Sequence, residues 1–293
     1  MYKSFYGLTE KPFSLLPDPN FLFMSKIHNM ALTMLQYGLL NQVGITVITG
    51  DVGAGKTTLI RKLLSELDNN LTVGLISNTH ESFGELMEWV AMSFGLEYKN
   101  KEKVALYDTF IDFVISEYAK SRRTVLIIDE AQNLSPSTME ELRMLSNINT
   151  DKDQILQLVL VGQPELRKTL MRHDLRQFAQ RISADYHLKT LNKDEVKEYI
   201  YHRISIAGGE PDIFQVDACD VIWKASNGVP RIINTLCDTA FVYGYAEQIK
   251  SITCDIVLDV IRDKKKGGIF TSAITNNDTA SKFDTETEKK NYA

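Results

Sequence analysis

Short apolar runs alternate with longer amphipathic stretches through the middle of the chain. From about Gly44 to His187, segments rich in β-branched residues are separated by segments whose apolar residues recur at helical spacing. This alternation predicts a mainly parallel sheet flanked by helices, because parallel neighbours need a crossover connection. Five strands are expected, at Ile45–Thr49, Thr72–Ser77, Thr124–Asp129, Gln157–Val161 and Asp185–Leu188.

The pattern changes after Leu191, where no further strand is expected. Asn192, with Glu195 three positions later, has the spacing of a capping box and predicts the start of a helix. A small all-helical domain should follow, with helices running through Ile206 and over Asp217–Ser226, Pro230–Ala246 and Asp255–Lys264.

These changes of pattern predict the domain boundaries. Beyond Gly267-Gly268 the chain is rich in Thr, Asn, Ser, Asp, Glu and Lys, which predicts disorder because too little apolar surface is available to bury. The expected division is an N-terminal segment over 1–43, an α/β core over 44–190, a helical lid over 191–266 and a disordered tail over 267–293.

Composition narrows the class of protein. A hydrophobic share of 44% over 293 residues is enough to fill the cores of two domains. The formal net charge of -5 gives no global attraction to nucleic acid or anionic lipid, so any such binding must depend on a local basic patch.

The cysteines and the N-terminus indicate the compartment. Cys219, Cys237 and Cys254 form an odd set without a Cys-x-x-Cys pair, and are expected to be small buried residues in a reducing environment. No run approaches the roughly 18 to 20 apolar residues that span a bilayer, and the N-terminus does not have the pattern of a signal peptide. A cytoplasmic location without a transmembrane segment is predicted.

A glycine-rich motif lies between the first strand and the next helical run. Gly50-Asp51-Val52-Gly53-Ala54-Gly55-Lys56-Thr57 fits the pattern G-x-x-x-x-G-K-[ST]. Glycines let backbone N–H groups face a phosphate, while lysine adds a cation and threonine a hydroxyl ligand for Mg²⁺. The motif predicts ATP and Mg²⁺ as ligands, held by Gly50, Gly53, Ala54, Gly55, Lys56, Thr57 and Thr58.

Two acids follow the third expected strand. Asp129 and Glu130 come directly after the apolar run Val125–Ile128, where α/β sheets place their ligands. Asp129 is predicted to hold the hydrated Mg²⁺ together with Thr57. Glu130 is predicted to orient and polarise the attacking water, because phosphoryl transfer depends mainly on positioning and charge neutralisation.

Four further residues are candidates for sensing the nucleotide. Gln163 follows the fourth strand and could reach the γ-phosphate or the water, or instead cap the helix that begins at Pro164. Arg181 is the first candidate, and Arg176 the second, for an arginine acting on a neighbouring subunit; the alternative is pairing with surface acids. Arg231 could reach the phosphates when the lid closes, or simply be solvated at the start of its helix.

Together these motifs resemble an AAA+ ATPase, with a five-stranded parallel sheet and a helical lid. More narrowly, the chain resembles the ExeA family, general secretion pathway protein A, over roughly residues 1 to 265. The motifs that carry this resemblance are Tyr6-Gly7-Leu8, Lys11-Pro12-Phe13, Pro17-Asp18-Pro19, Asp129-Glu130-Ala131-Gln132, Val161-Gly162-Gln163-Pro164-Glu165-Leu166 and Gln180-Arg181-Ile182 followed by Tyr186-His187-Leu188.

The resemblance implies an ATPase that forms a homo-oligomeric ring or filament with ATP and works with an inner-membrane protein in assembling the cell envelope. Type II secretion, a pilus or exopolysaccharide export are the candidate systems. The secretion proteins continue into a transmembrane helix and a peptidoglycan-binding domain. Neither occurs in this sequence, so it is expected to be a truncated ATPase domain or a freestanding relative.

The N-terminal segment has two interpretations. Its apolar residues Phe5, Phe13, Leu22 and Phe23 could line the adenine site with His28 at the base edge, or pack the segment onto the core. Residue by residue, packing is favoured, while the segment as a whole is expected beside the base. Trp89 and Trp223 are expected in the core.

Two other functions compete with envelope assembly. A DNA-associated ATPase resembling transposition regulators would need a basic stripe, for which the candidates are Lys99, Lys101, Lys103, Arg122, Arg123 and Lys264–Lys266. Because these cations are interspersed with acids or lie at segment ends, the envelope function is preferred. A scaffold whose slow hydrolysis acts as a timer is the third hypothesis.

Overall fold

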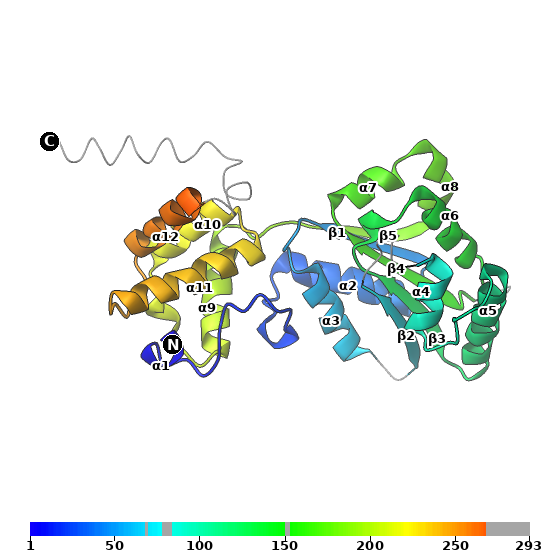
Figure 1. Ribbon diagram of the computed structural model, residues 1–293, viewed down its shortest axis with the longest axis horizontal. Coiled ribbons are helices and arrows are strands. Elements are labelled where there is room, and N and C mark those ends of the chain that lie inside the picture. Colours follow the sequence, from blue (N-terminus) through cyan, green and yellow to red (C-terminus); the bar gives the residue numbers. More distant parts are fainter. Residues whose placement is uncertain (68–69, 78–83, 150–152, 268–293) are drawn as a thin grey trace. The chain divides into compact units, whose positions relative to one another are not determined.

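The computed structural model describes residues 1–67, 70–77, 84–149 and 153–267 (Figure 1). The chain forms two compact units. One contains Pro17–Lys189, and the other combines Met1–Leu16 with the chain from Thr190 onward. The disorder expected over 267–293 falls, after Gly267, outside the described residues.

The first unit is built on a five-stranded sheet of order β2-β3-β4-β1-β5. All of its strand pairs are parallel, which confirms the fold class expected from the alternating pattern. The edge strand β5 begins at Ile182, earlier than the expected start at Asp185. Its first residues are partly exposed and include Ser183, so they give a weak strand signal in the sequence. The strands are β1 Ile45–Gly50, β2 Leu71–Ile76, β3 Arg123–Ile128, β4 Leu156–Gly162 and β5 Ile182–Leu188.

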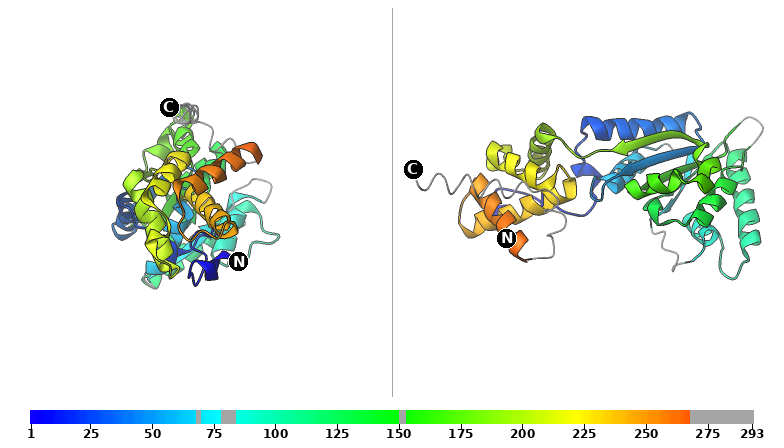
Figure 2. Two further views of the ribbon diagram at one scale, coloured as in Figure 1. Left: turned by 90° about the vertical axis from the view of Figure 1, so that its left-hand side faces the viewer. Right: turned by 90° about the horizontal axis from the view of Figure 1, so that it is seen from above.

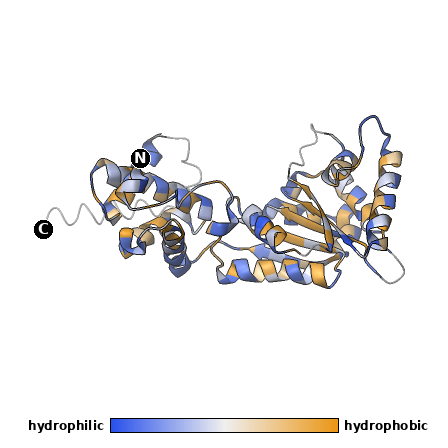
Figure 3. Ribbon diagram, turned by 90° about the horizontal axis from the view of Figure 1, so that it is seen from below, coloured by the Kyte–Doolittle hydropathy of each residue, from blue (hydrophilic) through white to orange (hydrophobic). Residues whose placement is uncertain are grey.

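The central strands are mostly hydrophobic, whereas the surrounding helices are mixed (Figure 3). Alternate residues of one strand enter different cores: Leu158 and Leu160 face one cluster, while Val159 and Val161 face the other. Burial on both faces therefore explains why these strands read as continuous apolar runs. Helix α2 and the helices α6 to α8 lie on opposite faces of the sheet (Figure 2).

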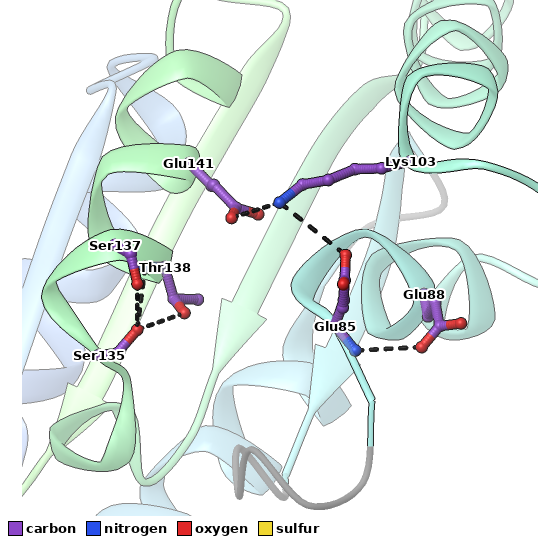
Figure 4. Close-up of polar contacts among 7 residues, drawn as sticks. All are labelled: Glu85, Glu88, Lys103, Ser135, Ser137, Thr138 and Glu141. Carbon is purple, nitrogen blue, oxygen red and sulfur yellow. Dashed lines mark hydrogen bonds and ion pairs between the residues drawn. The ribbon is translucent and has the colours of Figure 1, made fainter.

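The helices of this unit are placed by their apolar faces and caps. Ser135 caps the N-terminus of α6 by accepting from the backbone N–H of Thr138, and its hydroxyl also bonds those of Ser137 and Thr138 (Figure 4). The α-helices are α2 Lys26–Leu40, α3 Lys56–Glu66, α4 Leu86–Ser93, α5 Lys103–Ala119, α6 Pro136–Leu145, α7 Pro164–Leu170 and α8 Arg176–Ala179. The short 3-10 turns are η1 Pro19–Phe21, η3 Ala131–Asn133 and η4 His173–Leu175.

The second unit is helical in its described part. The expected capping box starts its first long helix, because Asn192 accepts from the backbone N–H of Glu195 and Glu195 accepts from that of Asn192, both at 3.0 Å. Its elements are α1 Tyr2–Phe5, α9 Lys193–Ile206, η5 Pro211–Ile213, α10 Val216–Ser226, α11 Pro230–Ala246 and α12 Cys254–Gly267.

The N-terminal segment expected over 1–43 is divided between the two units. Its first sixteen residues pack into the helical unit through aromatic contacts. Tyr2 and Tyr6 lie against Phe241 of α11, and Phe13 contacts both Phe214 and Phe241. Aromatic burial of this kind outweighs sequence neighbourhood in deciding to which unit the segment belongs.

A buried arginine anchors the same segment. Arg203 of α9 donates from Nε to the carbonyl oxygen of Pro12 at 2.5 Å and from Nη2 to that of Ser14 at 3.4 Å. Its Nη1 donates to the hydroxyl of Tyr199, which in turn donates to Asn234 at 2.7 Å. The guanidinium is therefore hydrogen-bonded to chain positions far away in sequence.

Two of the three cysteines are buried as expected, and the third is not. Cys219 and Cys237 are buried and Cys254 is partly exposed, and none of the three is in a disulfide. Burial raises the pKa of Cys219 to about 12, which keeps the thiol protonated and unreactive. Across the described residues, every helix is too short or too polar to cross a membrane.

Candidate active site

The glycine-rich loop connects β1 to α3 at the carboxyl edge of the sheet. Gly53 and Gly55 have φ values of 81° and 95°, a backbone region that favours glycine. A Cβ on Gly50 would lie 2.8 Å from the carbonyl oxygen of Leu188, so the loop also needs glycine for space. The loop therefore has the conformation in which backbone N–H groups can surround a phosphate.

Lys56 is buried at the start of α3, with 6% of its surface exposed. Its ammonium donates to the carbonyl oxygens of Gly50 and Asp51, at 2.7 Å and 2.9 Å, within its own loop. Burial lowers the pKa of Lys56, while the negative charges of Glu130 and Asp129 act in the opposite direction. Because both bonds are local, the ammonium can turn to a phosphate without disturbing the fold.

Thr57 and Asp129 form a pair of oxygen donors beside this loop. The Thr57 hydroxyl donates to Oδ2 of Asp129 at 2.8 Å, and Asp129 is buried. Burial raises the pKa of Asp129, against the hydrogen bonds from Thr57 and from the backbone N–H of Glu130. A buried carboxylate next to a hydroxyl offers two oxygen ligands, which suits a hard cation such as Mg²⁺.

The donor set also indicates how such a cation would be held. In the described part of the chain, no three His, Cys, Asp or Glu side chains gather in a metal-binding group. Mg²⁺ does not require such a cage, since it commonly keeps several waters and takes one or two carboxylates together with substrate phosphates. Thr57 and Asp129 thus fit a magnesium ion that arrives with a nucleotide.

Glu130 has a left-handed backbone, with φ 53° and ψ 34°. Two side-chain amides donate to its Oε2 atom, that of Gln163 at 3.1 Å and that of Gln132 at 2.7 Å. Gln163 occupies the N-cap position of α7 but its side chain makes no cap hydrogen bond there. The side chain of Gln163 therefore donates to Glu130 and does not cap helix α7.

Gln132 was not predicted to be a site residue, although it is the last residue of the Asp-Glu-Ala-Gln motif. Its position two residues after Glu130, inside the 3-10 turn η3, is the signal that could have identified it. A side chain there can return to the acid that begins the turn.

The two candidate arginines lie near the end of α6 and at α8. The guanidinium of Arg181 donates from Nη1 to the hydroxyl of Ser146 at 3.1 Å, and the same atom lies 3.4 Å from the carbonyl oxygen of Ser146. Arg176 is the first residue of α8 and is exposed. Their predicted action on a neighbouring subunit stays a prediction.

The other predicted residues are distributed between the two units. Thr58 follows Thr57 in α3 and is partly buried. Arg231 lies exposed in the first turn of α11, in the helical unit, so its approach to a nucleotide stays a prediction. Ala54 is buried within the loop.

The N-terminal apolar residues separate in the same way. Phe5 and Phe13 pack in the helical unit, Phe5 against Tyr6 and Tyr245. Leu22 packs against the core cluster of the α/β unit that contains α2 and α3. For these three residues the packing interpretation describes the structure.

His28 is buried beneath the glycine-rich loop. Its Nε2 lies 3.1 Å from the carbonyl oxygen of Ala54, and its Nδ1 lies 2.8 Å from the hydroxyl of Ser25, the N-cap of α2. Because a carbonyl oxygen only accepts, Nε2 must carry the proton. His28 therefore supports the backbone of the loop from below.

Comparison with known proteins identifies relatives of the α/β unit and of most of the chain. Residues 40–170 match the family described as AAA domain. General secretion pathway protein A of Aeromonas hydrophila is 40% identical over 247 residues, which cover 84% of this chain and 45% of the relative. The chain thus spans a little under half the length of that relative.

Solved structures support the fold. The ORC2 protein of Aeropyrum pernix, in its ADPNP and ADP complexes, is 17% identical, with a TM-score of 0.65 over 87% of this chain and 71% of that one. Cdc6p of Pyrobaculum aerophilum is 16% identical, with a TM-score of 0.64 over 85% and 71%. RuvB of Thermotoga maritima, a Holliday junction branch migration motor, is 21% identical, with a TM-score of 0.50 over 82% and 69%.

Proposed function

Because the chain belongs to the AAA ATPases, in the family of General secretion pathway protein A, we propose that it binds Mg-ATP and hydrolyses it to ADP and phosphate. One observation carries this proposal: Thr57, Asp129 and Glu130 stand together at the end of the loop that holds Lys56. This is the set of groups that phosphoryl transfer to water requires.

Each residue has a role that follows from its position. The loop backbone from Gly50 to Gly55 receives the phosphates, and Lys56 leaves the carbonyl oxygens of its own loop to neutralise them. Thr57 and Asp129 would hold Mg²⁺, which would neutralise part of the negative charge of the phosphates. Glu130 accepts a hydrogen bond from the attacking water and Gln163 helps to orient both.

Replacing the acid that orients the water tests the proposal. Glu130→Gln keeps the shape of the side chain but cannot accept a proton, so ATP affinity should stay within about twofold while turnover falls about 100- to 1000-fold. Calorimetry and phosphate release measure the two quantities. Glu140→Gln, on α6 and paired with Arg143, is the matched control and should behave as wild type. Loss of ATP binding in Glu130→Gln would contradict the assigned role.

We also propose that hydrolysis requires a homo-oligomer, in which Arg181 reaches the nucleotide of the neighbouring subunit. The arginine is tethered to Ser146 by hydrogen bonds to a hydroxyl and a carbonyl, which it can exchange for a phosphate. Arg181→Ala should leave nucleotide binding intact and remove the dependence of turnover on protein concentration. An unchanged concentration dependence in this variant would exclude Arg181 from that role.

Coupling to a cell-envelope system, through an inner-membrane protein partner and from the cytoplasmic side, is a further part of the proposal. Its support is the 40% identity to a general secretion pathway protein. A pull-down of the chain with the membrane proteins encoded by neighbouring genes would identify the envelope system. Arg231, in the helical unit, is proposed as the residue through which nucleotide state acts on that unit.

Binding to DNA is less well supported. Several of the cations that could have formed a basic stripe make contacts within the chain. Lys103 pairs with Glu141 at 2.5 Å (Figure 4) and Arg122 pairs with the buried Glu117 at 2.7 Å. Arg123 donates to the carbonyl oxygen of Leu39 at 2.8 Å. A cation that is already paired within the chain is less available to neutralise a phosphate and displace counterions from the nucleic acid, so these contacts favour a structural role.

A further inference from the structure

The amide of Gln132 joins the ends of two neighbouring strands. Its Nε2 donates to Oε2 of Glu130 at 2.7 Å, and its Oε1 accepts from the backbone N–H of Gln163 at 2.9 Å. Glu130 follows β3 and Gln163 follows β4, and these two strands are paired in the sheet. One side chain therefore connects the acid after one strand to the residue after the next.

Hydrogen-bonding chemistry determines which way the Gln132 amide faces. The backbone N–H of Gln163 can only donate, so the atom opposite it must be the oxygen of Gln132. The nitrogen is then directed at the carboxylate of Glu130, where it is a charge-assisted donor of the stronger kind. The orientation of this amide thus follows from its two neighbours together.

The surrounding backbone provides the space that Gln132 needs. A Cβ on Gly162 would lie 2.9 Å from Oε1 and 3.2 Å from the backbone nitrogen of Gln132. Contacts this short force a displacement, so even an alanine at 162 would push against Gln132. The left-handed backbone at Glu130 turns the chain so that Gln132 comes back to the carboxylate. Gly162 and the turn at Glu130 both serve this arrangement.

Resting on the proposed function, we propose that Gln132 is a positioning residue for the hydrolysis step, which fixes the carboxylate of Glu130 jointly with Gln163. Two amide donors converge on the same oxygen, Oε2. This restricts rotation about the last side-chain bond of Glu130 and so sets the direction in which the acid meets the attacking water. Positioning of this kind affects the rate of hydrolysis and leaves the affinity for ATP almost unchanged.

Gln132→Glu is the sharpest test. The variant has the same size and keeps an oxygen for the N–H of Gln163, but it replaces the donor to Glu130 by a second carboxylate oxygen. Turnover should fall about 10- to 100-fold, with the dissociation constant for ATP within about twofold of wild type. Gln132→Met, which has a similar length and neither hydrogen bond, and Gly162→Ala, which crowds the amide, should lower turnover in the same direction.

A matched control is available elsewhere in the chain. Gln36 of α2 also donates to a glutamate, Glu66, at 3.3 Å. Neither of these two residues has a role in the proposed site. Gln36→Glu makes the same change of charge and should leave turnover, ATP affinity and melting temperature at wild-type values. It separates a specific effect on Glu130 from a general effect of added negative charge.

The outcomes distinguish this inference from the proposed function. If the wild-type chain neither binds nor hydrolyses ATP, the proposed function fails. If wild type hydrolyses ATP and Gln132→Glu turns over at the wild-type rate or faster, the positioning role alone is overturned. It is also overturned if ATP affinity and melting temperature fall in parallel with turnover, because that pattern describes a structural residue.

Discussion

The two units of the chain bury charge in opposite ways. In the helical unit, Arg203 is hydrogen-bonded to carbonyl oxygens of the N-terminal segment, at Pro12 and Ser14, far away in sequence. In the α/β unit, the buried Lys56 is bonded to carbonyls of its own loop, at Gly50 and Asp51. The first arrangement ties distant parts of the chain together, while the second can open without unfolding anything.

This difference separates structural from functional buried charge. A buried charge whose partners are remote contributes to stability, since removing it leaves several distant polar groups unpaired. A buried charge whose partners are adjacent ties down less of the fold, which agrees with the ligand-binding role proposed for Lys56. Four variants test this comparison, taken in order of expected effect.

The largest effect is expected from Lys56→Ala. Loss of the ammonium should weaken ATP binding by about 4 kcal/mol, or about 1000-fold, because a charge-assisted partner of the phosphates is removed. Calorimetric titration measures the affinity, and a melting curve without nucleotide should shift little. A large fall in the melting temperature of the nucleotide-free variant would show that Lys56, like Arg203, stabilises the fold.

Arg203→Ala should show the reverse pattern. Truncation leaves the carbonyl oxygens of Pro12 and Ser14 without this donor inside the unit, which should lower the free energy of unfolding by about 3 kcal/mol. Chemical denaturation measures this loss. The nucleotide affinity of the folded variant should match that of wild type. A loss of affinity as large as that of Lys56→Ala would contradict the purely structural role of Arg203.

Glu117→Gln tests a third kind of buried charge, on α5 of the α/β unit. Glu117 accepts from the hydroxyl of Thr72 and pairs with Arg122 and Lys120, and these contacts lower its pKa to about 2. Removing the carboxylate charge should lower the free energy of unfolding by about 2 kcal/mol at neutral pH. Denaturant midpoints of the variant and of wild type measure the loss.

The same variant has a predicted pH dependence. Because the folded pKa lies below the ordinary value of 4.5, the carboxylate stabilises the fold above about pH 4.5 and loses this effect as the pH falls through about 2. The difference in melting temperature between wild type and Glu117→Gln should be largest near neutral pH and shrink on acidification within that window. A difference that is constant down to pH 2.5 would exclude the charge as its cause.

The smallest effect is expected from His28→Ala. The imidazole supports the carbonyl oxygen of Ala54 at 3.1 Å, so its removal should loosen the glycine-rich loop and weaken ATP binding by about 1 kcal/mol, or about fivefold. Asn29→Ala, at the exposed next position of α2, is the control and should bind ATP as wild type does. Identical affinities for the two variants would show that the contact does not matter.

Local pattern was sufficient to predict the sheet, the helices after Leu191 and the position of the two candidate-site motifs at the ends of β1 and β3. The runs that became β1, β3 and β4 are mostly apolar because both faces of those strands are buried. The glycine-rich loop could be recognised because its conformation depends on residue type at fixed spacing. The start of β5 could not, since an edge strand has an alternating and weaker signal.

Contacts between distant residues were decided by the tertiary structure alone. The pairing of β3 with β4 brings together Gln132, Glu130 and Gln163. The spacing of these residues in the sequence does not predict that pairing. In the same way, aromatic packing assigned residues 1–16 to the helical unit. Motifs specify which groups are present, whereas strand order and side-chain packing determine which of them touch.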